Sequence, residues 1–198
     1  MSDPTGTTEY AFPTLPDYLA SGLDVVFVGI NPSVYSVERG HYFARRTSRF
    51  WPAFSRSRLS AGVRAGLGVE TLGPEHDTEL LRFGFGFTDV VKRPSSNASQ
   101  LLPGELEEWA PRLRHRLERF QPGVACFHGL TAFRPFLRFA LGQPKAEPAL
   151  GPQTEKVGVA RLFVVPNPSP ANAHFTPADQ TGWYDQLADY LEQGRDRA

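Results

Sequence analysis

Asp24-Val25-Val26-Phe27-Val28-Gly29-Ile30-Asn31-Pro32-Ser33 is the stretch of sequence that decides the fold. Its apolar part, 24–28, is typical of a buried strand. The part that follows is typical of a loop, because Gly29 lets the backbone turn and approach a ligand, and Pro32 makes it rigid. Ligands of open parallel sheets bind just beyond the carboxyl ends of the strands. The stretch therefore predicts an α/β protein with a site at this strand end.

Asn31 is the polar side chain that this loop presents, with amide donors and a carbonyl acceptor. By itself the pattern also fits an asparagine that closes its own turn between strand and helix. A second junction favours a binding site. The apolar run 159–165 leads into Pro166-Asn167-Pro168-Ser169-Pro170, so two buried strands end in similar loops.

The length of 198 residues suits one compact three-layer α/β domain. We expect residues 1–12 to form a flexible tail and residues 13–198 to form a single domain. No apolar stretch approaches the ~20 residues of a membrane helix, and the polar, acidic N-terminus does not resemble a secretory signal. The composition predicts a soluble cytoplasmic protein without a membrane partner, and a monomer is the default expectation.

Metal and redox cofactors are not expected. The single cysteine, Cys126, excludes an internal disulfide and a cysteine-ligated metal centre, and its apolar surroundings predict a buried small hydrophobe. No G-x-S-x-G elbow of a serine hydrolase is present. The five histidines show no metal-binding spacing; they are His41, His76, His115, His128 and His174.

Arginine is concentrated in one segment although the formal net charge is +0. Residues 39–64 contain no Asp or Glu. A local basic surface of this kind attracts a phosphate backbone and fixes it through bidentate contacts. The segment also fits a solvated arginine-rich helix face, and that alternative stays open. The arginines are Arg39, Arg45, Arg46, Arg49, Arg56, Arg58 and Arg64.

Strands and helices alternate along the chain. This order predicts a three-layer α/β/α sandwich with a short, mainly parallel central sheet and no domain boundary. The Gly-rich segment 60–80 gives no clear prediction, and 94–103 and 142–157 are typical of loops. The predicted strands are 24–30, 84–91, 123–128 and 159–165, and the predicted helices lie near 48–59, at 104–120, and from Thr131 and Thr176 onward.

Three motifs in order resemble the mismatch-specific uracil-DNA and thymine-DNA glycosylase branch of the uracil-DNA glycosylase superfamily. They are Gly29-Ile30-Asn31-Pro32 with its continuation to Arg49-Phe50-Trp51, the middle segment 86–94, and Asn167-Pro168-Ser169. The match spans most of residues 24–190. The resemblance implies a monofunctional enzyme that flips uracil, and other damaged pyrimidines as a wider option, out of DNA. It hydrolyses the N-glycosidic bond and leaves an abasic site, without a cofactor.

The resemblance also implies the partner and the place of action. The partner is uracil-containing DNA, with G·U mismatched duplex as the first expectation and single strands as an extension. Such an enzyme would be associated with the nucleoid. Two other classes stay open, a hydrolase of free nucleosides and a non-catalytic nucleic-acid-binding module.

Asn31 matches the family residue that positions the attacking water and touches the base. An amide cannot take a proton, so we predict Asn31 as an orienting catalytic residue and Asp89 as the catalytic carboxylate. Asp89 stands where the thymine-DNA branch resembles asparagine, and a carboxylate there could polarise the water or stabilise the oxocarbenium ion. Asp89 could instead cap a turn or pair with Lys92 or Arg93.

Phe43 matches the ring that stacks on the flipped uracil, a contact worth roughly 1–3 kcal/mol per base. Tyr42 is the rival for this role, and a plain core aromatic is the alternative for Phe43. Backbone groups around Ile30 and the side chain of Asn167 complete the predicted base-binding set. Phe50 and Trp51 are assigned to the core.

The second motif departs from its relatives. Asn167 replaces the histidine of the best-known superfamily branch, so imidazole stabilisation of the leaving base is not expected. Ala171 stands where the branch has a bulky wedge, and no arginine follows it in the loop. We therefore expect weaker recognition of an opposing guanine and excision that extends to single strands. The predicted DNA contacts are Ser33, Arg45, Arg46, Arg49, Ser169, Pro170, Ala171 and Asn172.

Overall fold

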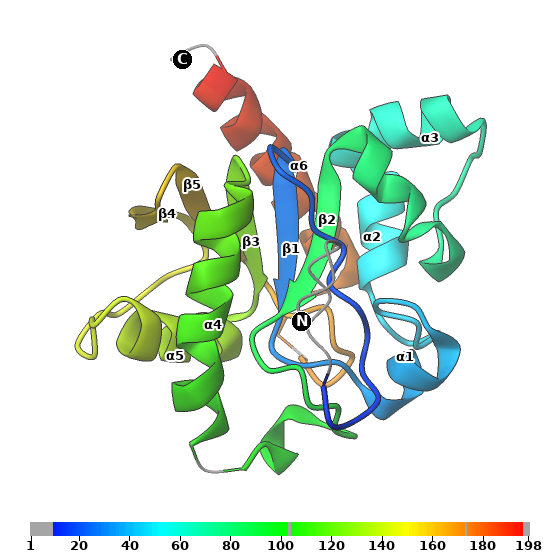
Figure 1. Ribbon diagram of the computed structural model, residues 1–198. Helices are drawn as coiled ribbons and strands as arrows, with labels where there is room; N and C mark the ends of the chain where they lie inside the picture. Colours follow the sequence, from blue (N-terminus) through cyan, green and yellow to red (C-terminus); the bar gives the residue numbers. More distant parts are fainter. Residues whose placement is uncertain (1–9, 103, 173, 196–198) are drawn as a thin grey trace.

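A computed structural model describes residues 10–102, 104–172 and 174–195. Within these residues a sheet has the strand order β2-β1-β3-β5-β4 (Figure 1). β2, β1, β3 and β5 are parallel, and β4 is antiparallel to β5, which confirms the mainly parallel sheet. The strands are β1 (Val25–Gly29), β2 (Phe85–Asp89), β3 (Val124–His128), β4 (Gly151–Val157) and β5 (Ala160–Val165).

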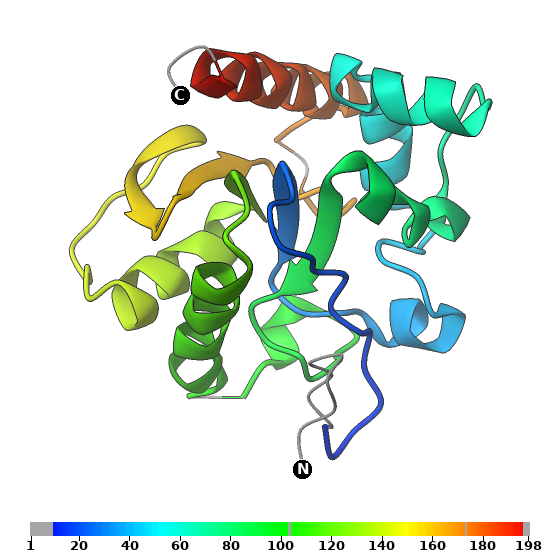
Figure 2. The same ribbon diagram turned by 45° about the horizontal axis from the view of Figure 1, so that its top comes forward.

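Helices cover both faces of the sheet, so the predicted three layers are confirmed (Figures 1 and 2). On one face α4 (Glu105–Phe120) and α5 (Leu130–Ala140) pack over Val26 and Val28 of β1. On the other face α2 (Phe50–Arg56) and α6 (Pro177–Arg195) pack over Val25 and Phe27. The shorter elements are α1 (Val34–Arg39), α3 (Ala61–Leu67), and the 3-10 turns η1 (Arg58–Ser60), η2 (Pro74–His76), η3 (Glu79–Phe83) and η4 (Ala98–Gln100).

β1 is buried along its whole length, as its apolar sequence predicted. The chain leaves β1 for β2 on one side and later adds β3 on the other. The strand order therefore reverses at β1, and the carboxyl ends of β1, β2 and β3 meet at the lower edge of the sheet in Figure 1. Open α/β sheets bind ligands at this kind of edge.

One predicted loop is wrong. Segment 142–157 contains β4, which forms a hairpin with β5 through Gly158, a residue with φ +57°. β4 lies at the edge of the sheet, and its residues alternate between exposed and covered positions. An edge strand needs no apolar run, so its polar sequence resembled a loop. The structure also adds α1 and α3, which the sequence did not predict, and shortens the expected helix 48–59 to α2 and η1.

Most of the predicted flexible tail, residues 1–9, lies outside the described residues. The rings of Tyr10 and Phe12 have centroids 5.8 Å apart, and both pack against Trp109 of α4. The chain from residue 10 onward is therefore packed on the domain. No helix within the described ranges is long and apolar enough to span a bilayer.

Candidate active site

The loop after β1 and the segment after β2 run side by side. The parallel pairing continues past both strands, because Val90 and Val91 donate backbone hydrogen bonds to Gly29 and Ile30 at 2.9 Å. Farther along, the Ser95 N–H donates to the Pro32 carbonyl at 3.1 Å. The first motif and the middle segment thus form one continuous wall at the edge of the sheet.

Asn31 is anchored in this wall by its amino group. Its Nδ2 donates to Ser95 Oγ at 2.8 Å and to the Arg93 carbonyl at 3.1 Å. Its Oδ1 accepts no hydrogen bond from any other described residue. The side chain is half-buried, so this oxygen is available to accept a hydrogen bond from a water molecule.

Asp89 is the last residue of β2 and lies in register with Gly29 of β1. A Cβ added to Gly29 would overlap Asp89 Oδ1, so any other residue here would displace the carboxyl group from its position. Asp89 is 3% exposed, and its Oδ2 has no hydrogen-bond partner among the described residues. Buried carboxyl oxygens are normally hydrogen-bonded, so this unpartnered oxygen indicates a functional position.

Burial raises the pKa of Asp89 to about 7. The nearby cations Lys92 and Arg116 lower this pKa, and the Asp17 carboxylate raises it. Asp89 therefore changes its charge near neutral pH, where a catalytic acid or base is most effective.

The cations near Asp89 are already paired with other carboxylates. Lys92 is completely buried, and its Nζ contacts Asp17 Oδ1 at 2.7 Å. Arg116 contacts Asp17 as well, with Nε 3.5 Å from Oδ2, and its Nη2 donates to the Asp89 carbonyl at 2.7 Å. Arg93 pairs with Glu105 at 2.6 Å. Asp89 therefore forms neither of the ion pairs with Lys92 or Arg93 that the sequence left open.

Phe43 and Tyr42 are placed differently. Phe43 has a φ of 53°, an uncommon conformation for a bulky residue, and is only partly buried. Its ring stacks on Phe50 with centroids 4.3 Å apart. Tyr42 is 3% exposed, its ring stacks on Phe87, and its hydroxyl donates to the Pro16 carbonyl. Phe50 and Trp51 are core residues, as predicted.

Asp77 holds the strained backbone around these aromatics. It is fully buried, accepts a 2.9 Å hydrogen bond from the Tyr42 N–H, and contacts His41 Nδ1 at 3.1 Å. Strained residues of this kind persist only where the surroundings fix them, and they cluster at binding sites.

His128 is a residue that sequence reasoning missed. It ends β3, it is 2% exposed, and its Nε2 lies 3.0 Å from the Tyr184 hydroxyl. Burial lowers the pKa of His128 to about 3, and the nearby Val28 carbonyl raises this pKa by a smaller amount. Nδ1 has no hydrogen-bond partner among the described residues. Its ring also touches Phe43, at 5.1 Å between centroids. The available signal was its position, directly after a buried run and before Gly129.

The second-motif loop closes on itself. Asn167 lies beside Gly129, its Oδ1 accepts a hydrogen bond from the Ser169 N–H, and its carbonyl accepts one from Asn172 Nδ2. Ser169 Oγ accepts from the Ala171 N–H at 3.3 Å. Ala171 and Pro170 are exposed at the tip of the loop.

Arg49 joins this loop to the first-motif side of the site. Its backbone N–H donates to the Pro168 carbonyl at 3.0 Å, and its guanidinium donates to the carbonyls of Asn172 and Phe175. Ser33, another predicted DNA contact, caps α1 by accepting a hydrogen bond from the Ser36 N–H. The side chains of Arg49 and Ser33 therefore form hydrogen bonds within the protein that hold these loops in place.

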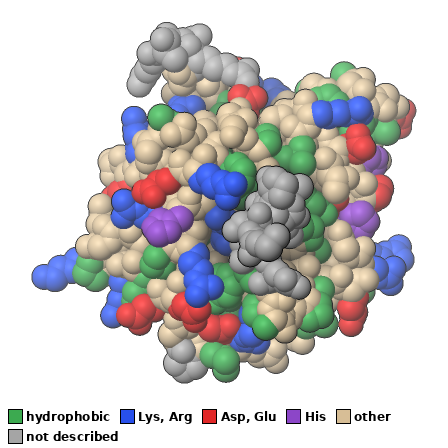
Figure 3. All heavy atoms as spheres, viewed as in Figure 1, with side chains coloured by type: hydrophobic (Ala, Val, Ile, Leu, Met, Phe, Trp, Pro, Cys, Tyr) green, Lys and Arg blue, Asp and Glu red, His purple; other side chains and the backbone are tan. Residues whose placement is uncertain are grey.

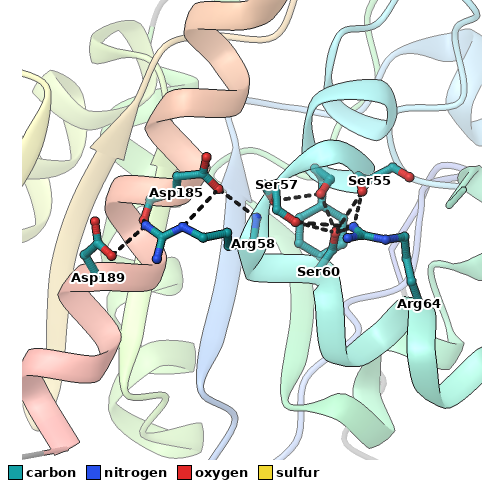
Figure 4. Close-up of polar contacts among 8 residues, drawn as sticks. Ser55, Ser57, Arg58, Ser60, Arg64, Asp185 and Asp189 are labelled. Atoms are coloured by element: carbon teal, nitrogen blue, oxygen red, sulfur yellow. Dashed lines mark hydrogen bonds and ion pairs between the residues drawn. The ribbon is translucent and has the colours of Figure 1, made fainter. Parts of the chain in front are cut away.

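The arginine-rich segment is not one basic surface, which corrects the sequence-based expectation. Arg58 contacts Asp189 of α6 at 2.6 Å, and Arg64 donates to Ser60 Oγ and the Ser55 carbonyl (Figure 4). Arg58 is thus paired with a carboxylate at the surface, and the partly buried Arg64 is engaged by its own segment. Arg45, Arg46 and Arg56 are exposed and have no ion-pair partner within the described ranges. The opposite face, over α4, instead intersperses acidic and basic side chains (Figure 3).

Two cavities of the described structure lie away from the strand ends. One, of about 310 Å³, lies between α4 and β4, and the other, of about 350 Å³, lies beside α2. No cluster of three or more His, Cys, Asp or Glu side chains suited to a metal ion occurs among the described residues.

The class of protein follows from this arrangement and from comparison with known proteins. The family model of the uracil DNA glycosylase superfamily matches residues 16–188, so the chain belongs to this superfamily. Its class is that of DNA glycosylases, hydrolases of DNA repair.

A solved structure supports the fold. The solution NMR structure of a protein from Methanosarcina acetivorans, named "putative Uracil DNA glycosylase", is similar with a TM-score of 0.54 and 21% sequence identity. The match covers 90% of this chain and 97% of that one. At this identity the likeness shows the fold alone.

Proposed function

We propose that this protein is a monofunctional glycosylase that excises uracil from DNA, with Asp89 as its catalytic carboxylate. The observation that carries the proposal is the buried carboxyl of Asp89, with an unpartnered Oδ2, at the strand end beside Gly29 and the Asn31 loop. Superfamily membership supplies the class of reaction. The two together support a base-excision site at the carboxyl ends of β1 and β2.

The reaction needs a water molecule on one side of the sugar and an acceptor for the negative charge on the leaving base. The water oxygen attacks C1′ of the deoxyribose, and the electron pair of the C1′–N1 bond leaves with uracil. Asn31 Oδ1 accepts one hydrogen bond from this water and orients it. Ionised Asp89 stabilises the positive charge on the sugar and takes the proton that the water releases.

Phe43 is the better candidate for stacking on the flipped base. One face of its ring packs on Phe50, and the residue is partly exposed, whereas Tyr42 is buried with its hydroxyl engaged. A base on the outer face of Phe43 would complete a stack of three rings. The strained φ of Phe43 supports this role, because such strain is maintained for function.

The DNA preference within the superfamily is part of the proposal. The short, exposed Ala171 supports weak wedging, and the loop around it is held by its own hydrogen bonds. We assign the chain to the mismatch-specific branch on its three motifs, with G·U duplex as substrate, and weak wedging supports an extension to single strands. We propose a monomer that works on the nucleoid.

A strand-cleavage assay tests the function. Uracil-containing oligonucleotides, opposite guanine, opposite adenine and single-stranded, are incubated with the enzyme, and alkali then breaks abasic sites. Excision in all three contexts with Asp89→Asn inactive but DNA affinity retained supports the proposal. Glu108→Gln, on the exposed face of α4, is the matched carboxylate-to-amide control.

The other outcomes distinguish the alternatives. Tight binding without cleavage indicates a binding module, and cleavage of free uridine without DNA activity indicates a nucleoside hydrolase. Strict dependence on an opposing guanine would refute the extension to single strands. Equal loss of binding and turnover in Asp89→Asn would remove Asp89 from the catalytic role.

A further inference from the structure

The cavity of about 350 Å³ beside α2 takes no part in the glycosylase site. Its lining begins at Ala44, the residue after Phe43, and continues along α2 to the start of η2 at Pro74. It therefore starts one residue away from the ring proposed to stack on the flipped base. Its lining residues are Ala44, Arg45, Arg46, Ser48, Trp51, Pro52, Ser55, Arg56, Thr71, Leu72, Gly73 and Pro74.

The lining combines apolar walls with unpaired positive charge. The exposed Pro52 and the outer edges of the nearly buried Trp51 and Leu72 supply the apolar surface. Arg45, Arg46 and Arg56 are three of the exposed arginines of the segment 39–64 that form no ion pair with a described carboxylate. The ligand that fits such a lining has a flat apolar part and a negative charge.

The cavity between α4 and β4 does not have this combination of apolar walls and unpaired positive charge. It is lined by Arg114 and Lys156 but also by Glu118 and Glu155, and Arg114 pairs with Glu118 at 2.8 Å. Its charges are mutually compensated. The cavity beside α2 has no acidic side chain in its lining, so it alone of the two favours an anion.

The walls of this cavity are already fixed. Trp51 Nε1 donates to the Tyr42 carbonyl at 2.8 Å, and the Leu72 N–H donates to Ser55 Oγ at 2.9 Å. These bonds tie α2 to the Phe43 loop on one side and to the segment 71–74 on the other. The volume lies within the ~300–1,000 Å³ that small-ligand sites usually have.

We propose that this cavity receives an unpaired nucleotide of the DNA strand that carries the flipped base, one or two positions away from it. The base packs against Trp51, Pro52 and Leu72, and its phosphate contacts Arg45, Arg46 or Arg56. This inference rests on the proposed function for the identity of the flipped base. It adds a preference for strands whose neighbouring nucleotide is free to unstack, as in single-stranded DNA.

The test measures DNA affinity rather than excision, so that it does not depend on catalysis. Single-stranded oligonucleotides with a stable abasic analogue at the centre are shortened one nucleotide at a time from either side. Fluorescence anisotropy gives Kd at fixed salt for each length. Removal of the nucleotide that occupies the cavity is expected to weaken binding about tenfold, in one step and on one side only.

Two variants locate this step. Thr71→Trp fills the exposed rim of the cavity, and Arg56→Ala removes one of its charges; each should abolish the step or reduce it to less than threefold. Arg112→Ala on α4 removes an arginine elsewhere and should leave the step unchanged. Equal melting temperatures of the variants and the parent show that the fold is intact, and Arg56→Ala carries the test if Thr71→Trp fails to fold.

Several results would overturn the proposal. These are small, even losses on shortening, a step that persists in both variants, or loss of uracil excision from the shortest substrate in Arg56→Ala. A deoxynucleoside monophosphate that competes as well as the longer strand would indicate a site for free nucleotides instead. If the protein excises no uracil at all, the proposed function fails, while the affinity step still decides this inference.

Discussion

Asp89 and His128 end β2 and β3 on either side of β1, and both are almost completely buried. Burial drives each side chain toward its neutral form, raising the pKa of Asp89 to about 7 and lowering that of His128 to about 3. The two strand ends therefore differ in one respect that matters near neutral pH. Asp89 titrates there, whereas His128 stays an uncharged imidazole against Phe43, Phe50 and Tyr184.

The neighbours explain the difference. Lys92 and Arg116 lie close enough to Asp89 to counter part of the effect of burial, so ionisation stays within reach. His128 has aromatic rings around it, and no carboxylate of the described residues stabilises its charged form. Although both side chains are buried, Asp89 can change its charge near neutral pH, whereas His128 remains neutral.

The largest expected effect comes from removing each group in turn. Asp89→Asn should lower kcat at pH 8 by about 10²–10⁴, the range typical of a general base or acid. His128→Asn should lower it less than tenfold, because a neutral residue contributes only position. Single-turnover excision of uracil measures both, and comparable losses in the two variants would erase the distinction.

Stability should move in the opposite direction to activity. The folded pKa of Asp89, about 7, lies above the ordinary value of 3.8. The protonated group therefore costs nothing below pH 3.8, and the penalty grows as pH rises toward 7. Asp89→Asn should raise the free energy of unfolding at pH 8 by on the order of 3 kcal/mol and leave it unchanged near pH 4. Urea unfolding at both pH values measures this, and a destabilised variant at pH 8 would contradict it.

The pH profile of excision should follow the ionisation of Asp89. Because the carboxylate is the active form, kcat should rise about tenfold per pH unit below 7 and level off above it. The residual activity of Asp89→Asn should be flat between pH 5 and 8. A profile that falls with rising pH would mean that the protonated acid is the active form.

A smaller effect is expected from the charge behind the site. Lys92→Met removes a cation that lowers the pKa of Asp89, so the midpoint of the profile should move to higher pH, by about 0.5 to 1 unit. Arg93→Met, whose guanidinium pairs with Glu105, is the control and should leave the midpoint in place. An unmoved midpoint in a folded Lys92→Met protein would remove Lys92 from the tuning of Asp89.

Local patterns predicted much of the fold and the framework of the site. The apolar run before Gly29 and the alternation of elements were enough to predict the parallel sheet. The strand-end position singled out Asn31, and Asp89 was singled out by the family resemblance of the middle segment. His128 was missed because an isolated histidine in an apolar run looks like core. Local patterns could not predict the partners of the arginines, since Asp189, the partner of the Arg58 guanidinium, lies 131 residues away in the chain. The same reason hid β4, whose pairing with β5 depends on the assembled sheet.

Arg49 has a consequence for engineering this protein. Its backbone and guanidinium clasp the carbonyls of Pro168, Asn172 and Phe175, while the residue itself caps the helix that follows the Phe43 loop. The Phe43 loop and the second-motif loop are thus held together by Arg49, although more than a hundred residues separate them in the chain. A loop exchange intended to change the DNA preference must transplant the clasp together with its acceptors, or the exchanged loop will disturb the ring on which the base is expected to stack.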